Sequence, residues 1–228
     1  MFASPRIRGI LAIITLGIVA AAVPGPRAFA QFSGAPPADK STVLRPPAGA
    51  RVAIVEFEDL ECPDCARAYP LLKQAAAKYN IPWVKYDFPL PMHVWSKQAA
   101  INARWFDTKS KKLGDDYREA VFANQMSIAT QDDLRSFTEK FANDHKVAFP
   151  FAVDPQGKLA AEVQADYQLG ERVGIEHTPT IWVVTNRTGN APPYVEIVDR
   201  NKLYDIIDQA LAATKPAPAH ATTASIKH

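Results

Sequence analysis

Residues 55–65 read VEFEDLECPDC and contain both cysteines of the 228-residue chain, at positions 62 and 65. The β-branched run at 51–57 predicts a short buried strand that ends just ahead of the cysteines. Residues 62–79 are rich in alanine, leucine and lysine, which predicts a helix that begins at the motif. Pro63 would lie in the first turn of that helix, where its missing N–H has no cost. The stretch therefore predicts a strand, a CxxC motif and a helix in direct succession.

The two cysteines, Cys62 and Cys65, are better explained by redox chemistry than by structural cross-linking. A disulfide stabilises a fold mainly by closing a long loop of the unfolded chain, and only two residues separate this pair. Structural zinc needs four cysteine or histidine ligands, and the sequence has no second pair of cysteines. We therefore expect a redox-active pair that works without a metal or another cofactor.

The rest of the chain predicts an α/β fold. Further strands are expected at 82–88, 180–185 and 194–198, four helical segments at 93–108, 115–125, 130–144 and 154–172, and a last helix at 201–213. Asp154 is expected to cap the fourth helical segment, with Pro155 at its first position. A strand–helix–strand unit followed by a hairpin and a helix predicts one mixed sheet flanked by helices. The helical block, at about 93–173, would be inserted into it, with Trp95, Trp105, Phe106, Phe122 and Phe137 packed between its helices.

Residues 1–30 have the pattern of a secretory signal peptide. Arg6 and Arg8 precede an uncharged apolar stretch at 9–23, and residues 28–30 form an Ala-x-Ala cleavage site. The apolar stretch is short for a membrane span, which needs about 20 residues. We expect cleavage after Ala30 and a location in the periplasm or otherwise outside the cytoplasm. An uncleaved N-terminal membrane anchor is the alternative.

Composition and charge further limit the class of protein and its domain organisation. Removal of residues 1–30 takes away three arginines and no acid, so the net charge changes from +2 to −1. No clustered basic surface is expected, which argues against a nucleic-acid partner. A Gly/Pro/Ala-rich flexible lead is expected at 31–50, one domain at 51–213 and a disordered tail at 214–228.

The stretch at 55–65, in its setting between a strand and a helix, resembles the active-site region of the DsbA-like branch of the thioredoxin superfamily. That branch also has a helical insertion after the second strand. In addition, His177-Thr178-Pro179-Thr180, just ahead of an apolar strand, resembles the family's cis-proline loop. The resemblance extends over about residues 51–213. It implies a thioredoxin-like mixed sheet with an inserted helical domain, and an exported thiol–disulfide oxidoreductase.

Cys62 is the expected nucleophile of this pair. At the N-terminus of a helix, unpaired N–H groups and the helix dipole stabilise a thiolate and lower the pKa of the thiol. Cys65 lies nearly one turn further into the helix, so we expect it to be more buried, to have a higher pKa and to act as the resolving thiol. Two inert core cysteines would not need this motif.

Several acids surround the motif. Asp64 departs from the family pattern, in which histidine or an aromatic residue is common at this position. A carboxylate beside a thiolate is a like charge, so Asp64 and Glu61 are expected to raise the pKa of Cys62 and make the disulfide less oxidising. Glu58 and Asp59 are expected to lie on a solvated rim without a specific role.

Glu56 lies six residues before Cys62, where the thioredoxin-like pattern has a buried acid beneath the disulfide. Strand alternation places it on the same face as Ile54, within an apolar run. Burial would raise the pKa of the carboxyl group towards neutrality, so that it could exchange a proton with Cys65. A glutamate of an edge strand in contact with water is the alternative.

The resemblance implies that Pro179 follows a cis peptide bond and faces the CxxC pair. The main chain of Thr178 would then bind substrate by β-augmentation. An ordinary trans bond at the start of a strand is the alternative. His177 is expected to be a loop residue, and His93 fits a recurrent family pattern without an assigned chemical role.

Three functions stay open at this point. The first is a dithiol oxidase that introduces disulfides into exported cysteine-containing proteins and is recycled by a membrane redox partner. The second is a reductase or isomerase of the same fold, which the acidic motif favours. The third is a non-catalytic binder of a soft ion such as Cu(I), with Met92, Met126 or His177 as a third ligand.

Overall fold

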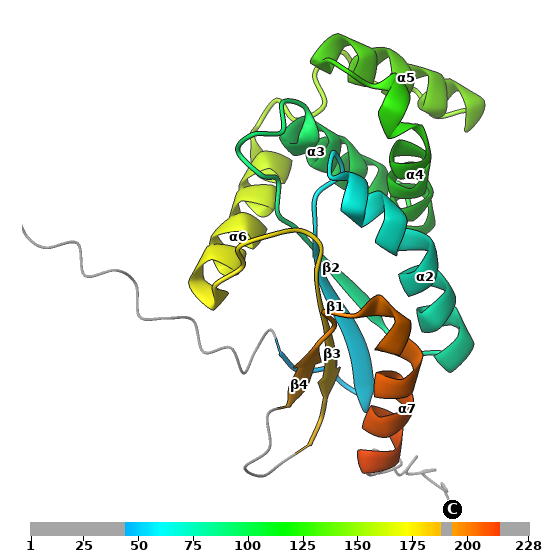
Figure 1. Ribbon diagram of the computed structural model, residues 1–228. Coiled ribbons are helices and arrows are strands. Elements are labelled where there is room, and N and C mark those ends of the chain that lie inside the picture. Colours follow the sequence, from blue (N-terminus) through cyan, green and yellow to red (C-terminus); the bar gives the residue numbers. More distant parts are fainter. Residues whose placement is uncertain (1–43, 188–192, 215–228) are drawn as a thin grey trace, which may run out of the picture. The chain divides into compact units, whose positions relative to one another are not determined.

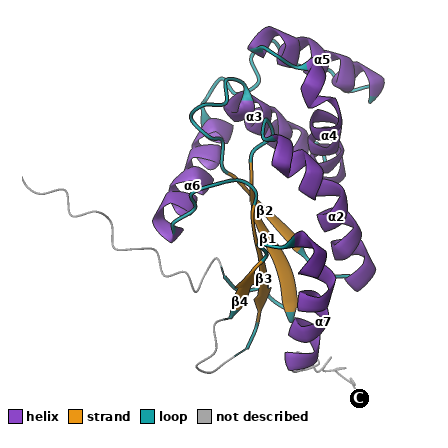
Figure 2. Cartoon of the chain, viewed as in Figure 1, coloured by secondary structure: helices purple, strands orange, loops and turns teal. Residues whose placement is uncertain are grey.

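The computed structural model describes residues 44–187 and 193–214 (Figures 1 and 2). In chain order the elements are β1 (Val52–Glu58), α2 (Pro63–Tyr79), β2 (Trp83–Asp87), α3 (Ser96–Asp107), α4 (Lys111–Asn124), the 3₁₀ turn η1 (Gln125–Ser127), α5 (Gln131–Asp144), α6 (Lys158–Val173), β3 (Thr180–Thr185), β4 (Tyr194–Glu196), the 3₁₀ turn η2 (Arg200–Lys202) and α7 (Leu203–Ala213). The predicted signal peptide, most of the predicted lead and nearly all of the predicted tail lie outside the described residues.

The strands form a mixed four-stranded sheet in the order β2-β1-β3-β4. β1 is parallel to β2 and antiparallel to β3, and β3 is antiparallel to β4. The strand that precedes the cysteines therefore has a hydrogen-bonded neighbour on each side. This arrangement confirms the predicted α/β fold, in which one mixed sheet is flanked by helices.

Alternate residues of the two central strands point to opposite faces of the sheet. Ile54 and Val183 pack with α2 and α7, whereas Val55 and Trp182 pack with the C-terminal half of α6. Figure 1 shows the same layers, with α2 and α7 on one side of the strands and α6 on the other. Leu44, within the predicted flexible lead, is buried on the α6 side.

The helical block that follows β2 has an aromatic core of its own. Its buried members include Trp95, Trp105, Phe106 and Phe122, and Phe137 packs against them, as predicted. Both cysteines belong to the same cluster. The helical block therefore packs directly against the CxxC motif.

The largest differences from the predicted helix starts, four residues each, are at α4 and α6. The side chain of Ser110 caps α4 by accepting the N–H of Leu113 (3.1 Å), so this helix starts four residues early. The fourth helix of the block, α6, starts at Lys158, because a turn closed by the N–H of Gly157 on the carbonyl of Asp154 (3.1 Å) comes first. Asp154 still accepts the N–H of Ala160 (2.8 Å), although it is not the N-cap residue.

A buried ion network joins the helical block to the sheet. Arg118 of α4 is only 4 % exposed and lies near one carboxylate from each of three elements: Glu58 of β1 (3.2 Å), Asp87 of β2 (3.8 Å) and Asp107 of α3 (3.0 Å). Removing an arginine and its carboxylates from water costs several kcal/mol per ion unless the charges are paired. The position of α4 over β1 and β2 therefore depends on these contacts.

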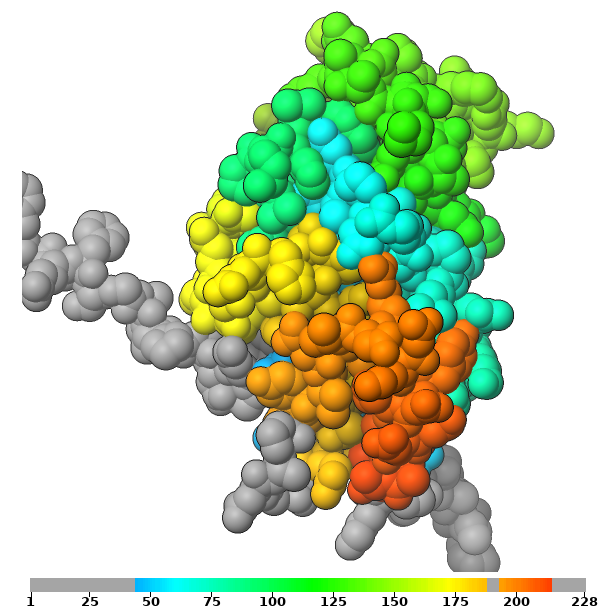
Figure 3. All heavy atoms as spheres, viewed as in Figure 1, coloured from blue at the N-terminus to red at the C-terminus, as the bar shows by residue number. Residues whose placement is uncertain are grey.

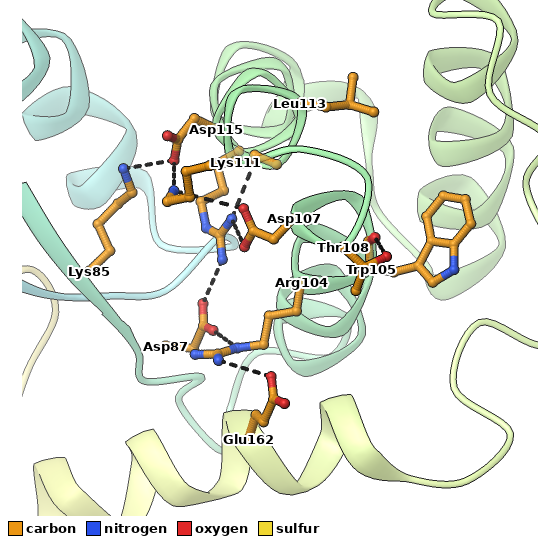
Figure 4. Close-up of polar contacts among 12 residues, drawn as sticks. Lys85, Asp87, Arg104, Trp105, Asp107, Thr108, Lys111, Leu113, Asp115 and Glu162 are labelled. Carbon is orange, nitrogen blue, oxygen red and sulfur yellow. Dashed lines mark hydrogen bonds and ion pairs between the residues drawn. The ribbon is translucent and has the colours of Figure 1, made fainter.

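Arg104 of α3 extends the network to α6. Its guanidinium contacts Asp87 (2.6 Å), Glu162 (3.5 Å) and Asp166. Figure 4 shows this side chain reaching from α3 towards Asp87 and Glu162. Asp87 thus lies close to both arginines and connects the two branches. None of the helices among residues 44–187 and 193–214 has the length and apolar character needed to cross a membrane.

Replacement of Arg118 by methionine is expected to lower the free energy of unfolding by about 3–5 kcal/mol, because the buried Glu58 and Asp87 and the partly buried Asp107 lose a shared counter-charge. Lys112→Met is the matched control, since Lys112 makes an exposed pair with Asp116 four residues along the same helix. Urea unfolding at neutral pH would measure both. A loss of less than about 1 kcal/mol in the Arg118 variant would contradict the importance of the network.

Candidate active site

Cys62 is the N-cap residue of α2, and Pro63 is its first helical residue, as predicted. The side chain of Cys62 is 7 % exposed and that of Cys65 is fully buried. Both thiols are free. The pair therefore presents one sulfur near the surface and one beneath it.

Cys62 is strongly acidic for a thiol. Its pKa is lowered from 9.0 to about 5. The hydrogen bond from Cys65 contributes most, partial burial opposes it, and the backbone N–H groups of Asp64 and Cys65 add to the lowering. These donors are the unpaired N–H groups of the first helical turn, which stabilise an anion at this position. At neutral pH Cys62 is therefore a thiolate.

Cys65 has the opposite character. Burial, the hydrogen bond it makes to Cys62 and the negative charge of Glu56 raise the pKa of its thiol well above the ordinary value. The N–H of Asp59 lies 3.4 Å from its sulfur and donates to it. The two sulfurs thus differ in both acidity and access to solvent.

The loop ahead of β3 brings Thr178 to the motif. In the thiol form, the sulfur of Cys62 donates to the carbonyl oxygen of Thr178 (3.3 Å). The peptide bond between Thr178 and Pro179 is cis. Residues 116 positions apart in the sequence thus meet at the reactive sulfur.

Glu56 is 1 % exposed and lies in a strand that is paired on both sides, so the alternative of a solvated edge-strand glutamate is wrong. Nε1 of Trp83 donates to one carboxyl oxygen (2.9 Å). The other oxygen, Oε1, is buried and has no hydrogen-bond partner among residues 44–187 and 193–214. Burial, followed by the negative charge of Glu58, raises the pKa of Glu56 well above its ordinary value.

The prediction that Glu58 and Asp59 lie on a solvated rim is wrong, because each is only 1 % exposed. Burial raises the pKa of Glu58 to about 7, although the positive charges of Arg118 and Lys85 oppose this rise. Strand alternation places Glu58 on the same face as Glu56, under the helices. The apolar residues around these acids were the available signal for burial.

Asp59 is the centre of a buried set of hydrogen bonds that sequence reasoning missed. Its carboxylate accepts from the N–H of Glu61 (2.7 Å), the N–H of Leu90 (2.6 Å) and the hydroxyl of Ser96 (2.5 Å), and it lies 2.7 Å from Nδ1 of His93. His93 thus acquires a structural contact, where the sequence assigned it no role. The set ties the loop between β2 and α3 to the motif.

Gln125 of η1 is a second site residue that sequence patterns did not identify. Its side-chain amide donates to the main-chain oxygens of Leu60 (2.7 Å) and Cys62 (3.1 Å). The helical block is thereby attached to the residue that carries the acidic thiol. No local pattern in the sequence points to this contact, because more than 60 positions separate the partners.

The acids nearest to the cysteines are compensated. Glu61 caps α3 by accepting the N–H groups of Trp95 (2.7 Å) and Ser96 (2.9 Å). Burial tends to raise the pKa of Asp64, but hydrogen bonds and positive charge from Arg200, and then from Arg67, hold it below its ordinary value. The pKa of Cys62 is lowered, as expected for a helix N-terminus, and the carboxylates of Asp64 and Glu61 are not among its main causes.

A small pocket of about 130 Å³ lies beside the motif, and its lining includes Asp64, His177, Pro179 and Arg200. His177 is exposed, as expected for a loop residue. In the part of the chain that the structure describes, no three histidine, cysteine or acidic side chains are grouped to hold a metal ion. Met92 and Met126, the other candidate metal ligands, are 71 % and 100 % exposed.

A family model described as Thioredoxin matches residues 46–198, about two thirds of the chain. The chain belongs to the thioredoxin family. The matched residues include both the CxxC motif at the start of α2 and the cis-proline loop that meets it. No curated protein matches the chain in sequence.

Solved structures of DsbA-type proteins share the fold. α-DsbA1 of Wolbachia pipientis is 17 % identical, with a TM-score of 0.60 over 72 % of this chain and 87 % of that chain. The catalytic domain of Proteus mirabilis ScsC is also 17 % identical (TM-score 0.58; 76 % and 95 % covered), and Pseudomonas aeruginosa DsbA2 is 23 % identical (TM-score 0.53; 73 % and 92 % covered). The family model thus shows the expected thioredoxin family, and the solved structures show that the chain shares the fold of DsbA-type proteins.

Iodoacetamide is expected to alkylate the reduced protein at Cys62 and to spare the buried Cys65. Because the thiolate is the nucleophile, the rate should be constant at neutral pH and fall as the pH decreases through about 5. Peptide mass spectrometry across a pH series would measure this profile. In the Cys65→Ala control the midpoint should rise, since the largest stabilising hydrogen bond is lost. A wild-type midpoint near 9 would contradict the thiolate.

Proposed function

We propose that this protein is an exported dithiol oxidase, with Cys62 and Cys65 as its redox pair. The observation that carries the proposal is the difference in acidity between the two sulfurs. A stabilised Cys62 thiolate favours the reduced enzyme, so the disulfide form gives up its bond readily to a client. The reductase alternative requires a weakly acidic nucleophile, and the compensated Asp64 removes the main argument for it.

The reaction balances without another cofactor. A client thiolate attacks Cys62 of the disulfide, which forms a mixed disulfide and releases Cys65 as a thiolate that takes up a proton. The client's second thiolate then attacks the client sulfur of the mixed disulfide and releases the Cys62 thiolate. Two electrons pass from the client dithiol to the enzyme, and the client leaves with a new disulfide bond.

Glu56 is the proposed proton donor and acceptor for Cys65. Its carboxyl group interacts electrostatically with both sulfurs, and Oε1 is free of hydrogen bonds with the described residues. A raised pKa lets the group give a proton to the departing Cys65 thiolate and later remove it when the disulfide reforms. Water reaches this position poorly, because Glu56 and Cys65 are both buried.

Thr178 and Pro179 are the proposed client-binding residues. The main chain of Thr178 lies against the Cys62 sulfur, and Pro179 lines the adjoining pocket. An extended client segment that pairs with this main chain would bring its cysteine to Cys62. Pairing through the backbone tolerates many side chains, which suits an enzyme with varied exported clients.

The proposed setting follows from the predicted signal peptide at 1–30, with an N-terminal membrane anchor as the alternative. A membrane redox partner would reoxidise the Cys62–Cys65 dithiol after each cycle. A solved structure with the same fold is titled a periplasmic thioredoxin-like protein from Salmonella enterica serovar Typhimurium (TM-score 0.56, 20 % identity). Its title is consistent with the proposed location.

The equilibrium of the Cys62–Cys65 disulfide with glutathione tests the direction of the reaction. An oxidase is expected to have a potential well above about −270 mV, the value for thioredoxin, and nearer to about −120 mV, the value for DsbA. The reduced fraction would be followed by alkylation and mass. A potential as low as that of thioredoxin would overturn the oxidase assignment and favour the reductase.

Replacement of Glu56 by glutamine is expected to slow reoxidation of the dithiol on the order of 10²-fold, because Cys65 loses its proton acceptor. The alkylation profile of Cys62 should change much less, since Glu56 is not among the main causes of its low pKa. Stopped-flow oxidation by a small disulfide would measure the rate. Trp83→Phe is the matched control, because it removes the donor to Glu56 and keeps the carboxyl group. An unchanged rate in the glutamine variant would contradict the proposed role.

A further inference from the structure

Arg200 contacts the CxxC dipeptide at two points. Nη2 donates to Oδ1 of Asp64 (2.6 Å), and Nη1 donates to the main-chain oxygen of the same residue (3.2 Å). Arg200 begins η2, 136 positions further along the chain. In Figure 3 the orange segment that leads into α7 lies against the cyan segment that carries α2. These contacts therefore connect the start of η2 with the start of α2.

The main-chain contact acts on Cys62 through one peptide group. The oxygen of Asp64 and the N–H of Cys65 belong to the same peptide unit, and that N–H is one of the donors that stabilise the thiolate of Cys62. A donor bound to the carbonyl end polarises a peptide and strengthens its N–H as a donor. The guanidinium thus both orients this peptide and increases its effect on the sulfur.

The side-chain contact acts through charge. An uncompensated carboxylate at Asp64 would repel the neighbouring thiolate. Arg200 holds this carboxylate with a side chain that is only 31 % exposed, so solvent screens the pair less than it would a fully exposed one. Arg67 contacts the same carboxylate oxygen (3.0 Å), but with a side chain that is 67 % exposed, so solvent screens its charge more.

Other titratable groups face the same region. Cys65 and Glu56 lie beneath Cys62, and His177 and Glu196 line the small pocket next to Arg200. All four stay unchanged when only Arg200, Arg67 or Asp64 is replaced. A difference between such variants therefore reports on the Arg200–Asp64 unit itself.

We infer that Arg200 is a positioning residue for Cys62: it neutralises Asp64 and orients the Asp64–Cys65 peptide, so that a CxxC motif with an acidic residue can hold a stable thiolate. The inference rests on the proposed role of Cys62 as the nucleophile. Its test needs no client protein, because the properties of the Cys62 thiol are measured directly.

The experiment compares Arg200→Met with Arg67→Met as the matched control. Two quantities are measured in each variant: the midpoint of the pH profile of Cys62 alkylation by iodoacetamide, and the equilibrium with glutathione. Arg200→Met is expected to raise the midpoint by about one pH unit and to shift the equilibrium roughly tenfold towards the disulfide. Arg67→Met is expected to change both values far less. Circular dichroism confirms that each variant is folded.

Two further variants separate the charge from the geometry. Arg200→Lys keeps the charge without the planar fork, so it should recover only part of the shift. The double variant Asp64→Asn/Arg200→Met removes both charges of the pair, so its midpoint should lie below that of Arg200→Met, because the carboxylate that repels the thiolate is gone. If Arg200→Met does not fold, the partial shift in Arg200→Lys decides the matter.

Equal midpoints for Arg200→Met and Arg67→Met would overturn the inference. So would a double variant Asp64→Asn/Arg200→Met with the same midpoint as Arg200→Met, since that would show that the charge of Asp64 does not act on Cys62. A wild-type midpoint near 9 would instead contradict the proposed function, whatever the differences among the variants. The two failures are therefore distinguishable.

Discussion

A negative charge on the Cys62 sulfur, stabilised by the Cys65 thiol and by the open N-terminus of α2, is the interaction on which the rest of the site depends. The first turn of a helix has N–H groups without partners inside the helix, and a thiolate accepts from them. The central strand β1 ends four residues before Cys62, so the motif lies at the end of the middle of the sheet. The loop before β3 and the turn η1 then place Thr178 and Gln125 against Cys62 from two other directions.

The acids around the motif show how the structure protects that charge. Glu61 is used as a cap for α3, Asp59 is surrounded by donors, and Asp64 is paired with Arg200. Glu58 lies in the ion network that holds α4 to the sheet. Burial raises the pKa of both Glu56 and Glu58, but Glu56 differs from the other acids because it interacts electrostatically with both sulfurs. A buried carboxyl group in that setting tends to be protonated, which suits the exchange of a proton with Cys65.

The inserted helices contribute to the site in two ways. Their aromatic core includes the cysteines, so it excludes water from the buried thiol. Arg104 and Arg118 fix the positions of α3 and α4 against β1 and β2. Each guanidinium needs carboxylates from several elements to offset the cost of its desolvation. The acidity of Cys62 and the packing of the helical block are thus parts of one arrangement.

Much of the fold around the motif could be predicted from short-range patterns in the sequence. The strand, the CxxC motif and the helix follow one another within 30 residues, so periodicity and the preference of proline for a first turn were sufficient to place them. The burial of Glu58 and Asp59 was missed because charged residues usually lie in water, and the partners that make burial tolerable are distant in the sequence. The start of α6 was missed because both a helix cap and a turn explain an Asp-Pro pair.

By itself, the sequence indicated the fold family and a redox-active pair, since two cysteines at this spacing ahead of a helix favour redox chemistry over structural cross-linking. It also determined the order of the strands and helices, because local propensity and hydrophobic period are properties of neighbouring residues. Only the tertiary structure decided how acidic Cys62 is and how Asp64 acts on it. The acidity of Cys62 depends in part on Thr178, and the charge of Asp64 is compensated by Arg200. Electrostatic and hydrogen-bond effects follow distance in space, which no local pattern in this chain specifies.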